Sequence, residues 1–186
     1  MTSKQILLLL ATAICLSSFS CNNDDTEIST PNEVITTLNY ILTPNNGGDP
    51  VTLSFRDLDG VGGDDPFVLG GTLAANQRYT GRIEVLNESV IPAEDVTTVI
   101  EEESTDHQLF YSSSISGLAI TYGDSDDNGN RFGLVSNLTT SVPGVGNLTV
   151  TLKHEPDKFA AGVASGDVTN AGGSTDIEAV FAITVQ

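Results

Sequence analysis

Apolar and polar residues alternate in short runs from Val34 onwards, as they do in strands that bury one face. In the first run, one face collects Val34, Thr36, Leu38, Tyr40 and Leu42. Asparagine and glycine then mark a turn before a second run, which ends near Phe55. Further strands are predicted at 79–87, 118–122, 148–154 and 177–185, with weaker ones at 67–73 and 132–138. Short strands without strand–helix–strand alternation predict an all-β, mainly antiparallel domain over 34–186, an immunoglobulin-like β-sandwich.

Residues 92–105 break the alternation and predict one short helix. Pro92 suits a first helical position, and Glu94 and Asp95 suit the positive end of the helix dipole. An apolar stripe follows, made of Val96, Val99 and Ile100.

The strand pattern also contains a candidate internal repeat. Residues 53–88 align without gaps on residues 118–153, which pairs Leu53 with Leu118 and Phe67 with Phe132. This alignment indicates two pseudo-repeats, which could pack face to face as the two layers of the sandwich.

The first 20 residues are typical of a signal peptide. Lys4 precedes an apolar run over 6–16, which is shorter than the ~20 residues of a membrane-spanning helix. Small residues then lead to Cys21 in an arrangement that resembles the lipobox of bacterial lipoproteins. We therefore expect a signal peptide over 1–20, diacylglycerol and palmitate on Cys21, and a flexible acidic tether over 21–33. The expected location is the outer membrane, at the cell surface or the periplasmic face, and the alternative is a secreted protein with a chance cysteine.

The charge of the chain limits which partners it can bind, and its cysteine content indicates whether disulfides can stabilise it. All 25 acidic residues follow Cys21, as do six of the seven basic ones, so the part after the signal peptide carries a formal charge of −19. Such a field repels nucleic acid, which we exclude as a partner. The only other cysteine, Cys15, lies inside the predicted signal peptide, so no disulfide can form within the mature chain.

Two acidic loops carry a candidate calcium pattern. Asp124, Asp126 and Asn128 place oxygen ligands at alternate positions before a glycine, as in the first half of an EF-hand loop. The bidentate acid expected at the twelfth position is absent. A companion loop contains Asp57 and Asp59, and the two loops could bind Ca²⁺ separately or jointly. The simpler alternative is that these residues form β-turns.

The chain contains two histidines, His107 and His154. His154 ends a predicted strand and lies on the same face as its alternate apolar residues. Strand alternation therefore predicts that this histidine points inward. The two together would suit a transition metal or an axial haem contact. The alternative is a purely structural role for each.

Catalytic signatures are absent from the sequence. It contains no G-x-S-x-G, H-E-x-x-H, C-x-x-C or phosphate-loop pattern, and its carboxylates are too numerous to single out an acid–base pair. The sequence therefore predicts a protein that is not an enzyme.

Several stretches, EVITTLNYILTP, SFRDLDG, LNESVIPAED, LKHEPDK and GDVTNAGGSTDIEAVF among them, together resemble a family of small Bacteroidota lipoproteins. The resemblance implies export and a lipid anchor, and it assigns no activity. Members often carry the label "type 1 periplasmic binding fold superfamily protein", which implies two α/β domains of roughly 250 or more residues in total. The strand pattern of this chain predicts an all-β domain instead.

These observations predict a lipid-anchored, exported lipoprotein that acts as a non-enzymatic binding or accessory module. Its ligand, whether a small molecule, a polymer or a protein, does not follow from the sequence. Two alternatives are a calcium-dependent surface adhesin or matrix component, which would use the two acidic loops, and a hydrolase without a recognisable motif.

Overall fold

The computed structural model describes residues 33–60 and 62–186. The predicted signal peptide, the lipidation site Cys21 and the tether up to residue 32 lie outside the described residues. The described part is mostly β and forms two sheets. None of its helices is long and apolar enough to cross a membrane.

The first sheet is antiparallel. Its strands are β1 (Thr37–Pro44), β2 (Val51–Arg56), β3 (Phe67–Leu69), β5 (Arg78–Asn87), β6 (Glu94–Asp95), β8 (Leu118–Tyr122) and β9 (Val135–Thr140). Across the sheet the order is β3-β2-β1-β5-β9-β8, and β6 pairs with the end of β5. The β1–β2 hairpin confirms the predicted turn, in which Gly47 and Gly48 adopt positive φ.

The second sheet contains four strands. They are β4 (Gly71–Leu73), β7 (His107–Ser113), β10 (Gly144–His154) and β11 (Ser174–Val185). Their order is β4-β11-β10-β7, and β4 and β11 form the one parallel pair within the described ranges. A helix, α1 (Thr97–Glu102), and two 3-10 turns, η1 (Val163–Ser165) and η2 (Val168–Asn170), complete the elements. The prediction of a mainly antiparallel, all-β domain is therefore confirmed.

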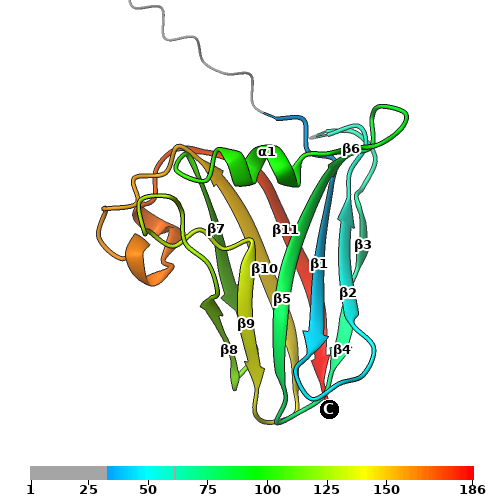
Figure 1. The fold of residues 1–186 in the computed structure, drawn as a ribbon. Helices are drawn as coiled ribbons and strands as arrows, with labels where there is room; N and C mark the ends of the chain where they lie inside the picture. The colour runs from blue at the N-terminus through cyan, green and yellow to red at the C-terminus, as the bar shows by residue number, and fades with distance from the viewer. Residues whose placement is uncertain (1–32, 61) are drawn as a thin grey trace, which may run out of the picture. The chain divides into compact units, whose positions relative to one another are not determined.

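The core lies between the two sheets, in an arrangement consistent with a β-sandwich (Figure 1). The alternate residues of β1 that were predicted to face inward, Leu38, Tyr40 and Leu42, are fully buried. Leu148, Val150 and Leu152 of β10 meet them from the second sheet in the same cluster. The described residues contain no cysteine, so burial of these side chains is the main stabilising contribution to the domain.

The predicted helix is present but shorter than expected. α1 covers Thr97–Glu102, and Ile100 is its buried residue. Glu94 and Asp95 do not start the helix as predicted, because their backbone pairs with β5 as strand β6. Strand β7, which follows the helix, was not predicted, because its apolar residues form a continuous run rather than an alternation.

The prediction of two repeats packed face to face is wrong. The first half of the alignment contributes β2, β3 and β5 to the first sheet and β4 to the second. The second half likewise contributes β8 and β9 to the first sheet and most of β10 to the second. Each half is therefore divided between the layers, and the shared pattern reflects the common alternation of strands.

Candidate metal centre

Two histidines and two carboxylates converge where β7, β10 and β11 meet the segment before β1. One ligand atom from each of Glu33, His107, His154 and Asp176 lies within 4.8 Å of every other. His107 Nε2 lies 3.0 Å from His154 Nδ1, 3.5 Å from Glu33 Oε2 and 3.9 Å from Asp176 Oδ2. Donors around a tetrahedral ion with bonds of ~2.0–2.1 Å are separated by about 3.3 Å. The ligand atoms of the four side chains are thus spaced nearly as they would be around a single metal ion.

Strand pairing places the two histidines. His107 begins β7 and His154 ends β10, and the two residues are direct partners in the ladder. Both point inward, as strand parity predicts for His154, and both residues are buried. Their rings meet edge to face with centroids 4.7 Å apart. This spacing leaves no room for a porphyrin plane between the nitrogens, so the pair suits a single ion rather than a haem.

A β-bulge brings in Asp176, which the sequence did not single out. In β11 the inward face comprises Ile177 and every second residue after it, so regular alternation would point Asp176 outward. The register between β10 and β11 shifts at this point, where Leu152 pairs with Ile177 and Lys153 pairs with Thr175. Asp176 is the extra residue, and its side chain is 0% exposed. Bulges re-aim side chains in this way beside functional sites.

Glu33, the second residue that the sequence did not single out, comes from the predicted tether. The backbone just after it is fixed to the first sheet, because Thr36 N donates to Leu86 O at 2.9 Å and Thr36 Oγ1 accepts from Glu88 N at 2.8 Å. The Glu33 side chain is 12% exposed, and its Oε2 atom is buried without a hydrogen-bond partner among the described residues. A buried carboxylate oxygen of this kind is available to a cation.

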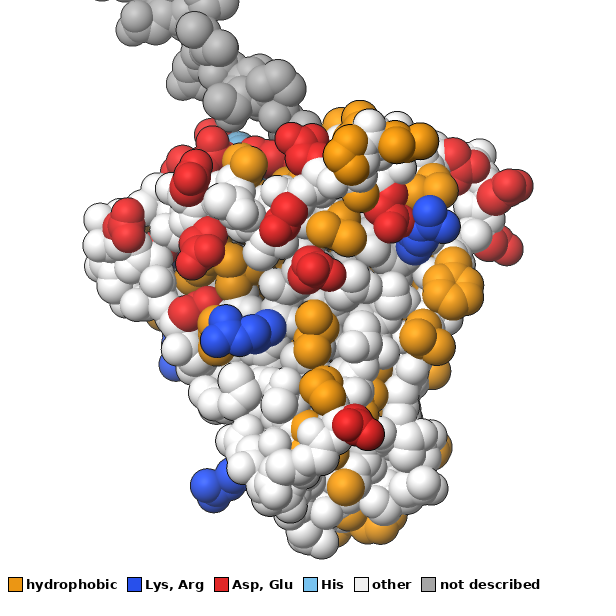
Figure 2. Space-filling view, turned by 45° about the vertical axis from the view of Figure 1, so that its right-hand side comes forward, with side chains coloured by type: hydrophobic (Ala, Val, Ile, Leu, Met, Phe, Trp, Pro, Cys, Tyr) orange, Lys and Arg blue, Asp and Glu red, His pale blue; other side chains and the backbone are white. Residues whose placement is uncertain are grey.

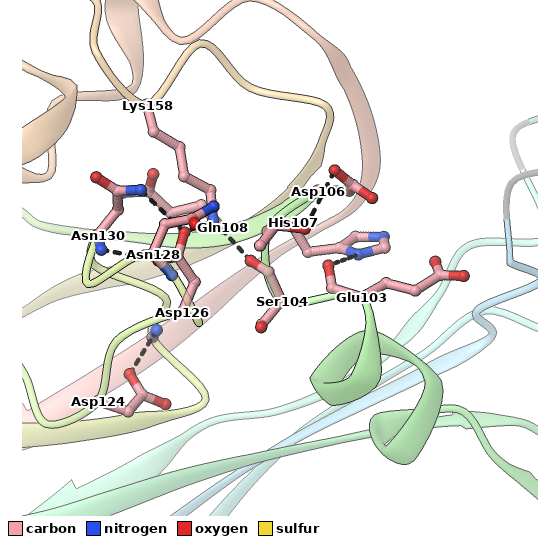
Figure 3. A network of polar contacts seen from close by, with 12 residues as sticks. Glu103, Ser104, Asp106, His107, Gln108, Asp124, Asp126, Asn128, Asn130 and Lys158 are labelled. Carbon is pink, nitrogen blue, oxygen red and sulfur yellow. Dashed lines mark hydrogen bonds and ion pairs between the residues drawn. The ribbon is translucent and has the colours of Figure 1, made fainter.

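A carbonyl next to the site selects the tautomer of His107. His107 Nδ1 lies 3.1 Å from Glu103 O, at the end of α1 (Figure 3). A carbonyl only accepts, so Nδ1 carries the proton and donates it to Glu103 O. The lone pair of Nε2 then faces the other three side chains. Metal-binding histidines are oriented by this kind of bond to the second ring nitrogen.

The charge of the site favours a divalent cation. Two carboxylates and two neutral imidazoles give the cluster a charge of −2 when both acids are ionised. Burial raises the pKa of the Asp176 carboxyl, and the nearby His107 and His154 only partly offset this. Acidic side chains also gather on the surface at the end of the domain where α1 lies (Figure 2). A bound cation would offset the cost of burying these carboxylates.

The residues of the first predicted calcium loop are engaged in internal bonds. Asp124 accepts from the backbone nitrogens of Gly133 and Val135, at 2.6 and 2.7 Å. Asp126 accepts from the backbone nitrogens of Asn128 and Asn130, and the ammonium of Lys158 lies 2.8 Å from its Oδ2 (Figure 3). The Lys158 ammonium thus occupies the position of a cation beside Asp126. These contacts favour the β-turn alternative, and calcium binding stays a prediction.

The second predicted calcium loop lies at the opposite edge of the first sheet. Asp57 and Asp59 follow β2 and accept from the backbone nitrogens of Gly60 and Asp64, at 2.8 and 2.9 Å. Strands β1, β5 and β9 separate β2 from β8, which leads to the loop with Asp124. At ~4.8 Å per strand, the loops start about 20 Å apart. Joint binding of one ion by both loops is therefore excluded.

Calcium is expected to stabilise the protein no more than sodium does at equal ionic strength. Asp126 already accepts four hydrogen bonds from nitrogen donors, so Ca²⁺ would have to displace the Lys158 ammonium. Screening of the net charge acts equally for both salts. Thermal melts in CaCl₂ and NaCl measure the difference. A saturable shift specific to calcium, lost in Asp126→Ala, would instead establish the calcium hypothesis.

Comparison of the chain with protein-family models, with curated proteins and with solved structures finds no match.

Proposed function

We propose that this protein is an exported, lipid-anchored binding module that holds one divalent transition-metal ion between His107, His154, Glu33 and Asp176. The observation that supports this most directly is the convergence of the four ligand atoms within 4.8 Å. The lipid on Cys21, the outer-membrane location and the resemblance to Bacteroidota lipoproteins remain sequence-based parts of the proposal, as does an immunoglobulin-like topology. The role is non-enzymatic, in keeping with the absence of catalytic signatures from the sequence.

The donor set indicates which metal ions the site prefers. Imidazole nitrogen suits Zn²⁺, Fe²⁺, Co²⁺, Ni²⁺ and Cu²⁺, whereas Ca²⁺ and Mg²⁺ take oxygen ligands almost alone. Two of the four donors here are imidazoles, and one of them is oriented by the Glu103 carbonyl. The proposal is therefore distinct from a calcium site in the acidic loops, and it uses different residues.

Calorimetric titration with Zn²⁺ tests the proposal. We expect one ion per chain with a Kd below ~1 μM, equivalent to about 8 kcal/mol. Changing His154 to alanine removes a donor that touches the ion, so the affinity should fall by at least ~100-fold. Ca²⁺ in excess should not displace Zn²⁺, because it binds imidazole poorly.

Glu102→Gln is the matched control, because Glu102 is an exposed acid on α1 outside the cluster. This variant should bind Zn²⁺ like the unchanged protein. If Zn²⁺ binds with no defined stoichiometry, or if Glu102→Gln weakens it as much as His154→Ala, the negative field alone attracts the ion and the proposed site is wrong.

A further inference from the structure

A cavity of about 420 Å³ adjoins the proposed metal centre. Asp176 connects the two, because its carboxylate is part of the ligand cluster and the residue is also one of those that line the cavity. Ile35, Phe55 and Ile177 supply apolar walls. This size lies within the range of ~300–1,000 Å³ found for small-molecule sites.

The sheet topology explains why the space is open. β11 pairs with β10 along its length, but on its other side it pairs with β4 only from Ile183 onwards. Just before β4, the chain pairs with β2 of the first sheet as strand β3. Among the residues that the structure describes, the stretch Thr175–Glu178 therefore has no paired strand on that side, and the cavity lies between this stretch and Phe55 of β2. The opening thus follows from the strand order.

We propose that the cavity admits a small, neutral heteroaromatic molecule whose nitrogen atom binds the metal ion as a further ligand. This inference rests on the proposed function, because the nitrogen needs a metal ion to bind. The ring of the molecule would lie against Ile35 and Phe55, and its nitrogen would approach the ion past Asp176. Zn²⁺ and Co²⁺ accept such a donor, since four-coordinate sites expand to five.

The negative charge of the cavity lining favours a neutral heteroaromatic molecule over an anion, and the need for a lone pair favours it over a protonated amine. Three acidic residues, Asp57, Asp176 and Glu178, are among those that line the cavity, so their negative charge would repel an anion there. A protonated amine is attracted by these groups but has no lone pair to give the metal. A neutral aromatic nitrogen keeps its lone pair and matches the softness of the two imidazoles already in the site.

The test uses the protein loaded with Co²⁺, whose visible absorption reports changes in its ligands. Benzimidazole should change this spectrum saturably, and it should bind about tenfold more tightly than imidazole. The reason is that its second ring buries roughly 60 Å² more apolar surface. Benzoate, which has a similar shape and a negative charge, should leave the spectrum unchanged.

Thr175→Phe tests the location of the ligand. Thr175 is an exposed residue that lines the cavity, and a phenyl ring there should weaken benzimidazole at least tenfold while Co²⁺ stays bound. Val180→Phe adds the same ring to an exposed position of β11 outside the cavity, and it should have no effect. Ile35→Phe fills the cavity from the opposite wall, and it provides the same test if Thr175→Phe does not fold.

The outcomes separate this inference from the proposed function. Failure of Co²⁺ to bind overturns both. Binding of Co²⁺ with no response to benzimidazole, or an equal response to benzoate, overturns only the ligand inference. Loss of Co²⁺ from the protein on adding benzimidazole, detected after gel filtration, also overturns it, because the ligand would then compete with the site rather than complete it.

Discussion

Lys158→Met is expected to lower the free energy of unfolding by about 3–5 kcal/mol, because it leaves a buried carboxylate without its counter-charge. The side chains of Lys158 and Asp126 are 5% and 0% exposed, and their charged atoms lie 2.8 Å apart. The same ammonium donates to Ser104 O at 2.6 Å, so it joins the loop after α1 to the loop before β9. Thermal or urea denaturation measures the loss, which corresponds to roughly 10 °C in melting temperature for a domain of this size.

Lys153→Met is the control for this prediction. Lys153 also donates to a backbone carbonyl, that of Gly173, but its bonds are exposed, so we expect a loss of less than ~1 kcal/mol. Combining Lys158→Met with Asp126→Asn removes both buried charges and should recover part of the stability. A Lys158→Met variant as stable as Lys153→Met would show that the buried pair contributes nothing.

Acid should weaken the Lys158–Asp126 pair in a defined range of pH. Burial favours the neutral form of Asp126, but the bonds from Lys158 and Asn130 outweigh it and hold the pKa of this carboxyl below its usual value. A carboxyl whose pKa is lower in the folded state stabilises the protein above the unfolded-state pKa of ~3.9. This contribution is lost as the pH falls through the lower, folded-state pKa. The double variant Lys158→Met/Asp126→Asn has no carboxyl at this position, so it should lose less stability in that range of pH.

Much of the fold could be predicted because strand alternation is a local signal. The faces of β1, β2 and β10 follow directly from residues such as Leu38, Leu53 and Leu152, which are all fully buried. The division of strands between the sheets depends on pairing between segments far apart in the chain, such as β1 with β5, and no local pattern records it. The face-to-face repeat failed for this reason.

Only the two histidines of the candidate metal centre could be singled out from the sequence, and the two carboxylates could not. His107 and His154 stood out because the chain has no other histidine, but their contact depends on the register of β7 against β10. Asp176 could not be found by parity, because the bulge reverses the direction that alternation assigns to it. Glu33 looked like one more acid of the tether. The one feature of the sequence that marks Asp176 is its position immediately before the long apolar alternation that begins at Ile177.

Asp176→Asn should have opposite effects on the metal-free and the metal-bound protein. Burial raises the pKa of the Asp176 carboxyl, which means that its charged form is costly in the folded state. The neutral amide avoids this cost, so the metal-free variant should melt at an equal or higher temperature than the unchanged protein. With Zn²⁺ the order should reverse, because an amide is a much weaker metal ligand than a carboxylate.

The expected size of the reversal follows from ligand binding to the folded state. At a Zn²⁺ concentration 1,000 times its Kd, the unchanged protein gains about 4.1 kcal/mol, or roughly 10 °C. If the variant binds ~100-fold more weakly, the same concentration gives it only about 1.4 kcal/mol. Glu178→Gln, an exposed acid two residues along β11, should keep the full gain. If Asp176 had only a structural role, Asp176→Asn would lower the melting temperature of the metal-free protein. Zn²⁺ would then raise the melting temperatures of the variant and of the unchanged protein equally.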